Sequence, residues 1–341
     1  RNYLSNSCDG ITVKAALLSG PRLLRVTDVP IPSRPQGWAL VKTLAVGICG
    51  TDKAFYTGSY PLFKKPLIPG HEVVGIVVEG SRSLVGRTVV SEINFPCWSC
   101  EVCRSGMYTH CPYKKTLGID FDGGMAEYFV APESALHLAE GLDTVVATEV
   151  EPLAALIHGL RVTPVGPEDT VAIIGTGNLA YLLYQLLKLR GAKPVIIARK
   201  GSPKASLLVL EGFRVAYVED TSKLLEETWM GLGFDVVFDV SGDPSAVEFA
   251  IDIARPRGTV HLKSTPGSRG NVNLTRAVVK EVKIATSRCG DFRDFEEAIK
   301  LLKSGAVKPK ITSVFVGVES IPEAFEKALE REQFKVAIRM I

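Results

Sequence analysis

The chain has 341 residues, of which 46% are hydrophobic and 23% charged, and this composition is typical of a globular protein large enough for two domains. Its 40 basic and 37 acidic residues give a formal net charge of +3 without long blocks of one sign, which argues against nucleic acid and lipid surfaces as partners. No stretch is long and apolar enough for a membrane span, and residues 1–10 look like a polar leader without the apolar core of a secretory signal. We therefore expect a cytoplasmic protein that binds small molecules and no membrane.

Short runs of β-branched residues, separated by glycine and proline, occupy the first part of the chain. They lie at 13–18, 38–46, 73–78 and 87–91. Such runs predict an all-β, barrel-like domain. Residues 92–112 interrupt the pattern with a lobe rich in cysteine, and residues 123–130 resume it as a further strand.

Two short motifs in this domain gather metal-binding side chains among turn residues. They are Cys49-Gly50-Thr51-Asp52 and Gly70-His71-Glu72. Zinc accepts thiolate sulfur, imidazole nitrogen and carboxylate oxygen, and a catalytic zinc site leaves one position for water or substrate. The motifs predict such a site. The alternative is that Cys49 is a small buried hydrophobe and that His71 belongs to a surface turn.

The lobe contains four closely spaced cysteines, Cys97, Cys100, Cys103 and Cys111. Four thiolates at this spacing can surround one tetrahedral ion, and a shell closed by four protein ligands leaves no position for substrate. The spacing therefore predicts a structural zinc site. The alternative is a pair of disulfides, which the reducing cytosol disfavours.

In the second half of the chain strands and helices alternate, which predicts a doubly wound parallel sheet. The expected strands are 171–174, 195–198, 215–218, 234–240, 259–263 and 282–286, and the expected helices are 149–160, 179–189, 204–211, 222–229 and 244–255. The C-terminal part holds two more helical patterns, at 292–302 and 322–329, and two strands, at 311–316 and 336–340. These last elements either extend the sheet or return to the first domain.

A glycine-rich turn, Gly175-Thr176-Gly177-Asn178-Leu179-Ala180, joins a strand to a helix. In a dinucleotide-binding turn the first glycine permits the tight turn, the second lets the pyrophosphate approach the backbone, and the helix N-terminus offers amide groups to the phosphates. The flanking strand and helix are those that this mechanism requires. The alternative is a glycine turn that only packs.

The dinucleotide is predicted to be NADP, with NAD less favoured. An acidic residue that binds the adenosine ribose of NAD is expected about 20 residues after the turn. This chain has Arg199 and Lys200 there, and a guanidinium pairs well with the 2′-phosphate of NADP. The alternative is that both cations are only solvated.

The order of these motifs resembles the zinc-dependent medium-chain dehydrogenases, a family that includes alcohol, polyol, threonine and archaeal glucose dehydrogenases. The resemblance adds Glu151-Pro152 to the motifs above and covers the chain from about residue 13 to its end. It implies a GroES-like, partly open β-barrel domain over residues 1–158 and a Rossmann domain over residues 159–289. It also implies that residues 290–341 return to the first domain and that subunits form a homodimer or homotetramer.

The resemblance further implies two zinc ions per subunit, one structural and one catalytic. Cys49 and His71 match two ligands of the catalytic zinc, and Glu151 matches the third ligand of polyol and glucose dehydrogenases. Glu72 matches a carboxylate that binds zinc in some relatives. Whether Glu72 or Glu151 completes the coordination stays open at this point.

Other residues match the family's proton transfer and cofactor sites. Thr51 matches the hydroxyl that takes the proton from the alcohol, and Asp52 matches the carboxylate that orients the zinc-bound histidine. Lys335 falls where relatives place a cation near the cofactor pyrophosphate. One departure is Ala54, because several relatives have a histidine there that ends a proton relay.

Together these expectations describe a zinc-dependent oxidoreductase that transfers a hydride between NADP(H) and an alcohol/ketone pair, with a secondary or bulky alcohol favoured. One alternative is a polyol or glucose-type sugar dehydrogenase. Another is a zinc-free quinone or enoyl reductase of the same superfamily, which would leave Cys49, His71 and Glu151 without a role. The alternative outside this class is a structural or regulatory protein that binds the cofactor without turnover.

Overall fold

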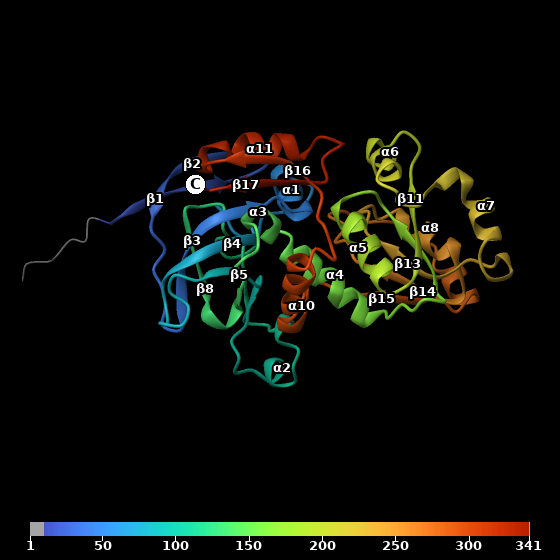
Figure 1. The fold of residues 1–341 in the computed structure, drawn as a ribbon, viewed down its shortest axis with the longest axis horizontal. Coiled ribbons are helices and arrows are strands. Elements are labelled where there is room, and N and C mark those ends of the chain that lie inside the picture. The colour runs from blue at the N-terminus through green and yellow to red at the C-terminus, as the bar shows by residue number, and fades with distance from the viewer. Residues whose placement is uncertain (1–9, 341) are drawn as a thin grey trace, which may run out of the picture.

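The computed structural model describes residues 10–340; residue 341 and residues 1–9, most of the expected leader, lie outside the described part. A β-rich domain and an α/β domain lie side by side, and helices α4 (Val150–Val162) and α10 (Phe292–Lys303) pack between them (Figure 1). This combination confirms the fold class predicted from the sequence. No helix among residues 10–340 is long and apolar enough to cross a membrane.

The β domain is built on a seven-stranded sheet of order β16-β17-β3-β4-β5-β9, in which β8 also pairs with β3. The strands of the first part of the chain are β1 (Thr12–Leu18), β2 (Leu24–Pro30), β3 (Trp38–Gly47), β4 (Glu72–Glu79), β5 (Thr88–Ser91), β6 (Asn94–Phe95), β7 (Lys115–Thr116), β8 (Tyr128–Pro132) and β9 (Leu136–Leu138). On β4, Val73 and Val77 pack into the core of this domain, whereas Val74 packs toward α4. Successive strand residues face opposite sides, so β4 is buried on both.

Two elements of the β domain differ from the sequence prediction. Helix α1 (Gly50–Thr57) was not predicted, because eight residues of mixed polarity give little periodicity, but it buries Phe55 and Tyr56. The strand expected at 123–130 begins only at Tyr128. Residues 123 and 124 instead lie against Gly70 and Val73, so closely that a Cβ atom at either position would meet them within 2.4 Å.

The C-terminal part returns to the β domain and does not extend the α/β sheet. Strands β16 (Ile311–Val316) and β17 (Lys335–Arg339) are parallel to each other, and β17 pairs antiparallel with β3, with Ala337 opposite Gly47. Helix α11 (Ile321–Ala328) packs its buried Phe325 into the core of the β domain. Figure 1 shows these red elements beside the blue N-terminal strands.

The α/β domain has a six-stranded parallel sheet of order β12-β11-β10-β13-β14-β15. Its strands are β10 (Thr170–Ile174), β11 (Lys193–Ala198), β12 (Val215–Tyr217), β13 (Phe234–Asp239), β14 (Ala254–Leu262) and β15 (Lys283–Thr286). Its helices are α5 (Asn178–Leu189), α6 (Pro203–Leu210), α7 (Thr221–Glu226), α8 (Ala246–Ile253) and α9 (Thr275–Val279). The chain reverses direction along the sheet between β10 and β13, and such switch points are where α/β sheets bind ligands.

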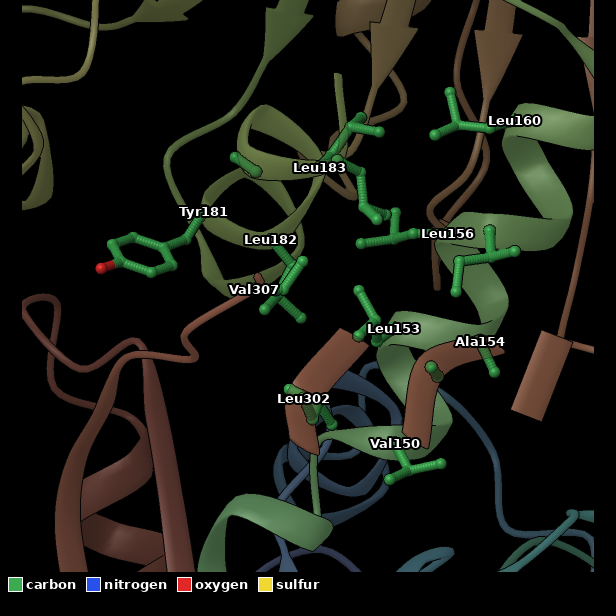
Figure 2. Close-up of a cluster of buried hydrophobic side chains, with 14 of the residues drawn as sticks. Val150, Leu153, Ala154, Leu156, Leu160, Tyr181, Leu182, Leu183, Leu302 and Val307 are labelled. Carbon is green, nitrogen blue, oxygen red and sulfur yellow. The ribbon is translucent and has the colours of Figure 1, made fainter. Parts of the chain in front are cut away.

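The two domains share one hydrophobic core around α4, shown in Figure 2. Leu153, Leu156 and Leu160 of α4 lie against Leu182 and Leu183 of α5, and α10 closes the cluster. Each buried leucine contributes roughly 1.5–3 kcal/mol relative to exposure, so the packing fixes α4 firmly between the domains. The first turn of α4 carries Glu151, whose position is therefore set by this core.

Candidate active site

A single cleft of about 1310 Å³ brings residues of the predicted metal and cofactor sites together. It is lined by Cys49, Thr51, His71, Glu72, Glu151, Gly175, Thr176, Gly177, Asn178, Leu179, Arg199 and Lys335. Asp52, a residue of α1, is fully buried, and Lys200 does not line the cleft. The cleft thus joins metal-type ligands of the β domain to the glycine turn of the α/β domain.

The start of α1 fixes the predicted proton-transfer residues. Cys49 is the residue before the helix, and its backbone N–H donates to Asp52 Oδ2 at 2.9 Å. Asp52 Oδ1 lies 3.9 Å from Nδ1 of His71, which precedes β4. One short helix therefore places Cys49 and Thr51 in the cleft and a carboxylate behind the imidazole.

The charges around His71 suit a cation. Burial disfavours the protonated imidazole, but the negative charges of Cys49 and Asp52 outweigh it and raise the pKa of His71 well above its ordinary value. Glu151 acts in the same direction, while burial raises the pKa of its own carboxyl group. Sulfur, nitrogen and carboxylate donors in a site with excess negative charge fit Zn²⁺.

This donor set is less compact than the cysteine lobe. In the described part of the chain, only the four lobe cysteines form a group of three or more potential ligands whose atoms all lie within 4.8 Å of one another. Cys49, His71 and Glu151 line one cleft, but their ligand atoms are more widely spaced.

Glu72, which also lines the cleft, is paired with a buried lysine. Its Oε2 lies 2.5 Å from Lys335 Nζ, and Glu149 Oε1 lies 3.4 Å from the same ammonium group. Burial lowers the pKa of Lys335, but Glu149 and Glu72 reverse this and raise it above its ordinary value. The three groups form a buried ion-pair cluster, whereas Glu151 forms no ion pair in the described part of the chain.

Lys335, which was expected near the cofactor pyrophosphate, lines the same cleft as the glycine turn. Lys335 is only 4% exposed, and its ammonium group is held by two carboxylates because a buried charge requires partners. Its partner Glu149 also contacts the glycine turn, because Glu149 Oε2 accepts a hydrogen bond from Asn178 Nδ2 at 2.7 Å.

The four lobe cysteines have the geometry of a tetrahedral zinc site. The sulfur–sulfur distances are 3.5 Å from Cys100 to Cys103, 3.8 Å from Cys100 to Cys111 and 3.6 Å from Cys111 to Cys97. Zn–S bonds of about 2.3 Å in a tetrahedron separate sulfurs by about 3.8 Å. A disulfide needs about 2.05 Å, and the four thiols are free, so the disulfide alternative is wrong.

The glycine turn has the conformation that a dinucleotide site needs. Gly175 has φ +120°, and a Cβ atom there would lie 3.1 Å from the backbone of Ser241. Gly177 precedes α5 without a side-chain cap, so the first amide groups of the helix are free for phosphate. Ala180, in place of a third glycine, is fully buried and packs in the shared core.

Arg199 follows β11 at the edge of the cleft and pairs with Asp243. The hydrogen bond from Ser245 and the charge of Arg199 lower the pKa of Asp243 to about 2. Asp243 also lines the cleft, so the adenosine end contains one carboxylate beside the expected cation. Thr176 Oγ1 and Ser202 Oγ lie 3.2 Å apart at the same end.

Comparison with known proteins agrees with both halves of this site. Residues 35–141 match the alcohol dehydrogenase GroES-like domain, and residues 179–304 match the zinc-binding dehydrogenase domain. A sorbitol dehydrogenase of Halalkalibacterium halodurans is 32% identical over 84% of this chain and 86% of its own. The chain belongs to the zinc-dependent medium-chain dehydrogenase/reductase family.

Further relatives of this medium-chain dehydrogenase agree in sequence and in fold. An alcohol dehydrogenase of Geobacillus stearothermophilus is 30% identical over 92% of this chain and 95% of its own. The L-idonate 5-dehydrogenase of Escherichia coli superposes with a TM-score of 0.87 at 25% identity, covering 97% of this chain and 99% of its own. A zinc-binding dehydrogenase of Sinorhizobium meliloti 1021, solved bound to NADP, gives a TM-score of 0.83 at 26% identity over 96% and 99%.

Family membership makes this medium-chain dehydrogenase a zinc-containing oxidoreductase of alcohols, as the motifs predicted. It argues against the zinc-free reductase and against a protein without turnover. The charged residues of the cleft region that sequence reasoning missed include Glu149, Asp243 and Lys263. Each is a lone charged residue at the end of an element, where no motif distinguishes it from a solvated side chain.

Proposed function

We propose that this medium-chain dehydrogenase oxidises a secondary hydroxyl group of a polyol with NADP⁺ and catalyses the reverse reduction of the ketone. The observation that carries the proposal is one cleft lined by Cys49, His71 and Glu151 at one side and by the turn at Gly175 at the other. The polyol substrates named for relatives, such as sorbitol, favour a polyol over a simple bulky alcohol.

Cys49, His71 and Glu151 would hold the catalytic zinc, and Cys97, Cys100, Cys103 and Cys111 the structural zinc. When bound, the catalytic zinc is a Lewis acid that favours the alkoxide form of the alcohol. Thr51, two residues into α1, holds the hydroxyl proton and passes it on. Asp52 positions His71 from behind, and Lys335 pairs with Glu72.

The turn from Gly175 to Leu179 would hold the pyrophosphate with backbone amide groups of the α5 N-terminus. Arg199 would bind the 2′-phosphate of NADP, exchanging Asp243 for a doubly charged partner. The NADP-bound relative supports this choice. If Asp243 and Arg199 separated, the free carboxylate of Asp243 would favour NAD instead of NADP.

A homodimer is part of the proposal. Strand β15 is an edge of the six-stranded sheet, and the apolar side chains beside it are exposed: Leu274, Val278, Val279 and Ile284. An unpaired strand edge next to an apolar patch is the geometry by which two sheets join.

The proposed reaction is tested by steady-state kinetics on a panel of polyols, aldoses, secondary alcohols and aryl ketones, with NADP and NAD in parallel. We expect polyols with NADP⁺ to give the highest kcat/KM, and Cys49→Ala to abolish turnover because it removes a proposed zinc ligand, while NADPH still binds by fluorescence. Full activity of metal-free Cys49→Ala protein would contradict the mechanism. Equal kcat/KM with NAD would contradict the role of Arg199.

A further inference from the structure

Side chains hold the glycine turn of the proposed cofactor site from two sides. On the adenosine side, Thr176 Oγ1 and Ser202 Oγ lie 3.2 Å apart. On the side of the β domain, Asn178 Nδ2 donates to Glu149 Oε2 at 2.7 Å. The second contact connects the two domains, because Asn178 is the first residue of α5, whereas Glu149 forms an ion pair with Lys335 of β17.

The turn by itself supplies little conformational restraint. Gly175 has φ +120°, and a Cβ atom added at Gly177 would meet no other atom within 4 Å. Gly177 also gives α5 no side-chain cap. Glycine loses more conformational freedom on folding than any other residue, so a turn built on glycines needs outside contacts to keep one conformation. Asn178 provides such a contact at the start of the helix.

Glu149, the partner of Asn178, is itself firmly placed. It directly precedes α4, whose apolar side chains pack in the core that both domains share. Its side chain is buried, and Oε1 lies 3.4 Å from Lys335 Nζ. A buried carboxylate requires partners, so the lysine and the asparagine restrict it to one position. Asn178 Oδ1 has no hydrogen-bond partner among residues 10–340, so its carboxamide is held through Glu149.

The segment that carries Glu149 also carries a residue of the proposed zinc site. Glu151 lies in the first turn of α4 and lines the cleft together with Asn178. Because one rigid segment carries both carboxylates, the hydrogen bond from Asn178 to Glu149 fixes the glycine turn relative to Glu151. The distance between a cofactor at the turn and a substrate at the zinc site depends on this relation, and small misplacements of reacting groups slow a reaction strongly.

We propose that Glu149 is a positioning residue of the cofactor site. Its hydrogen bond to Asn178 holds the first turn of α5, and with it the amide groups offered to the pyrophosphate, in the conformation that binds. Glu149 does not line the cleft, so it acts through Asn178. The inference rests on the proposed function, because it requires a dinucleotide at this turn. A turn that is ordered before binding loses less freedom on binding, and this raises the affinity.

The test measures the dissociation constant of NADPH by fluorescence titration of the zinc-loaded protein, without turnover. Glu149→Met removes the acceptor. Asn178→Ala removes the donor and leaves both ion pairs of Lys335 in place, so it also serves if Glu149→Met does not fold. Each variant should bind NADPH about tenfold more weakly than the wild type, because a hydrogen bond to a charged group contributes about this factor or more. Unchanged binding by Asn178→Ala would overturn the proposal.

The double variant Glu149→Met/Asn178→Ala distinguishes positioning from general loosening. If Glu149 acts through Asn178, the double variant should also bind NADPH only about tenfold more weakly than the wild type. Independent effects would multiply to about 100-fold, and this result would overturn the proposal. Glu149→Gln keeps an acceptor oxygen for Asn178 and should bind NADPH more tightly than Glu149→Met. Equal affinities of these two variants would assign the effect to charge and overturn the positioning role.

Asp235→Asn is the matched control, because Asp235 is another paired carboxylate that contacts β10. Its Oδ2 accepts a hydrogen bond from the backbone N–H of Thr170 at 2.8 Å, at the end of β10 opposite the glycine turn. This variant should bind NADPH like the wild type; an equal loss of affinity would indicate general destabilisation and overturn the positioning role. If the wild type binds neither NADPH nor NADH, the proposed function fails and this inference with it. If the wild type binds NADPH and Asn178→Ala binds it equally well, only the positioning role fails.

Discussion

At the scale of single residues, Lys335 is the side chain of the site whose ion pairs we expect to matter most for stability. Its ammonium group is fully buried between Glu72 and Glu149, and no other cation contacts these carboxylates in the described part of the chain. Removing one partner of a buried ion pair leaves an uncompensated charge, which typically costs about 3–5 kcal/mol. The cluster therefore holds β17 against β4 and α4 and also fixes where Glu72 points.

Lys335→Met should accordingly lower the free energy of unfolding by about 3 kcal/mol at pH 7, measured by denaturant titration. Burial already raises the pKa of Glu149, and loss of the lysine raises it further, so the folded variant takes up a proton as the pH falls. The deficit should therefore be smaller at pH 5 than at pH 7. The double variant Lys335→Met/Glu72→Gln, which removes one carboxylate charge, should recover part of the loss; no recovery and no pH dependence would contradict the ion-pair account.

Residue-level prediction worked where chemistry and spacing act together. Cys49 and His71 stand in short motifs whose residue types suit zinc, and the fold brings both into one cleft. The orientation of Glu72 could not be predicted, because it depends on Lys335, which is far away in sequence. Pairing between distant charges follows from packing, and packing leaves no local pattern.

At the scale of elements, the cysteine lobe depends on its proposed metal. It contains one α-helix, α2 (Glu101–Arg104), one 3-10 helix (Tyr108–His110) and few buried apolar side chains, so its own core is small. Tyr108 anchors it, donating its hydroxyl hydrogen to Glu92 at 2.7 Å and accepting one from the backbone N–H of Phe292 at 2.6 Å. A lobe of this kind needs a cross-link to stay folded.

Cys103→Ser should therefore reduce the zinc content measured by mass spectrometry from two ions per subunit to one, because it breaks the four-cysteine shell. The lobe should also become sensitive to limited proteolysis, as few other contacts order it. Cys289→Ser, at a thiol outside both ligand sets, should keep both ions. Retention of two ions in Cys103→Ser protein would contradict the structural site.

At the scale of the whole molecule, the apolar patch beside β15 determines assembly in our proposal. Val278 is 75% and Val279 is 77% exposed, although both are apolar, and their helix α9 directly precedes the edge strand β15 in the chain. We expect light scattering to give about twice the subunit mass of 36.9 kDa. Val278→Asp should shift the protein toward the monomer, because it places a charge in the contact. Leu210→Asp, at an equally exposed leucine of α6, is the control; a monomeric wild type would contradict the dimer.

The sequence by itself determined the types of element and the chemistry of the motifs. Hydrophobic residues recur every two positions in strands and about every 3.6 positions in helices, and this difference distinguishes the β domain from the α/β domain. The functions of the four cysteines and of the glycine turn follow from the local spacing of their residues. These features are local, so residues within one stretch suffice to specify them.

Only the tertiary structure decided how distant stretches meet. In the folded chain β17 pairs with β3, and the packing of α4 fixes the position of Glu151. Glu72 pairs with Lys335, and Lys263 and Arg288 line the same cleft. Each of these depends on burial and on the partner that a charge finds once water is excluded. Such partners are chosen by the free energy of the whole fold, which no single stretch of sequence contains.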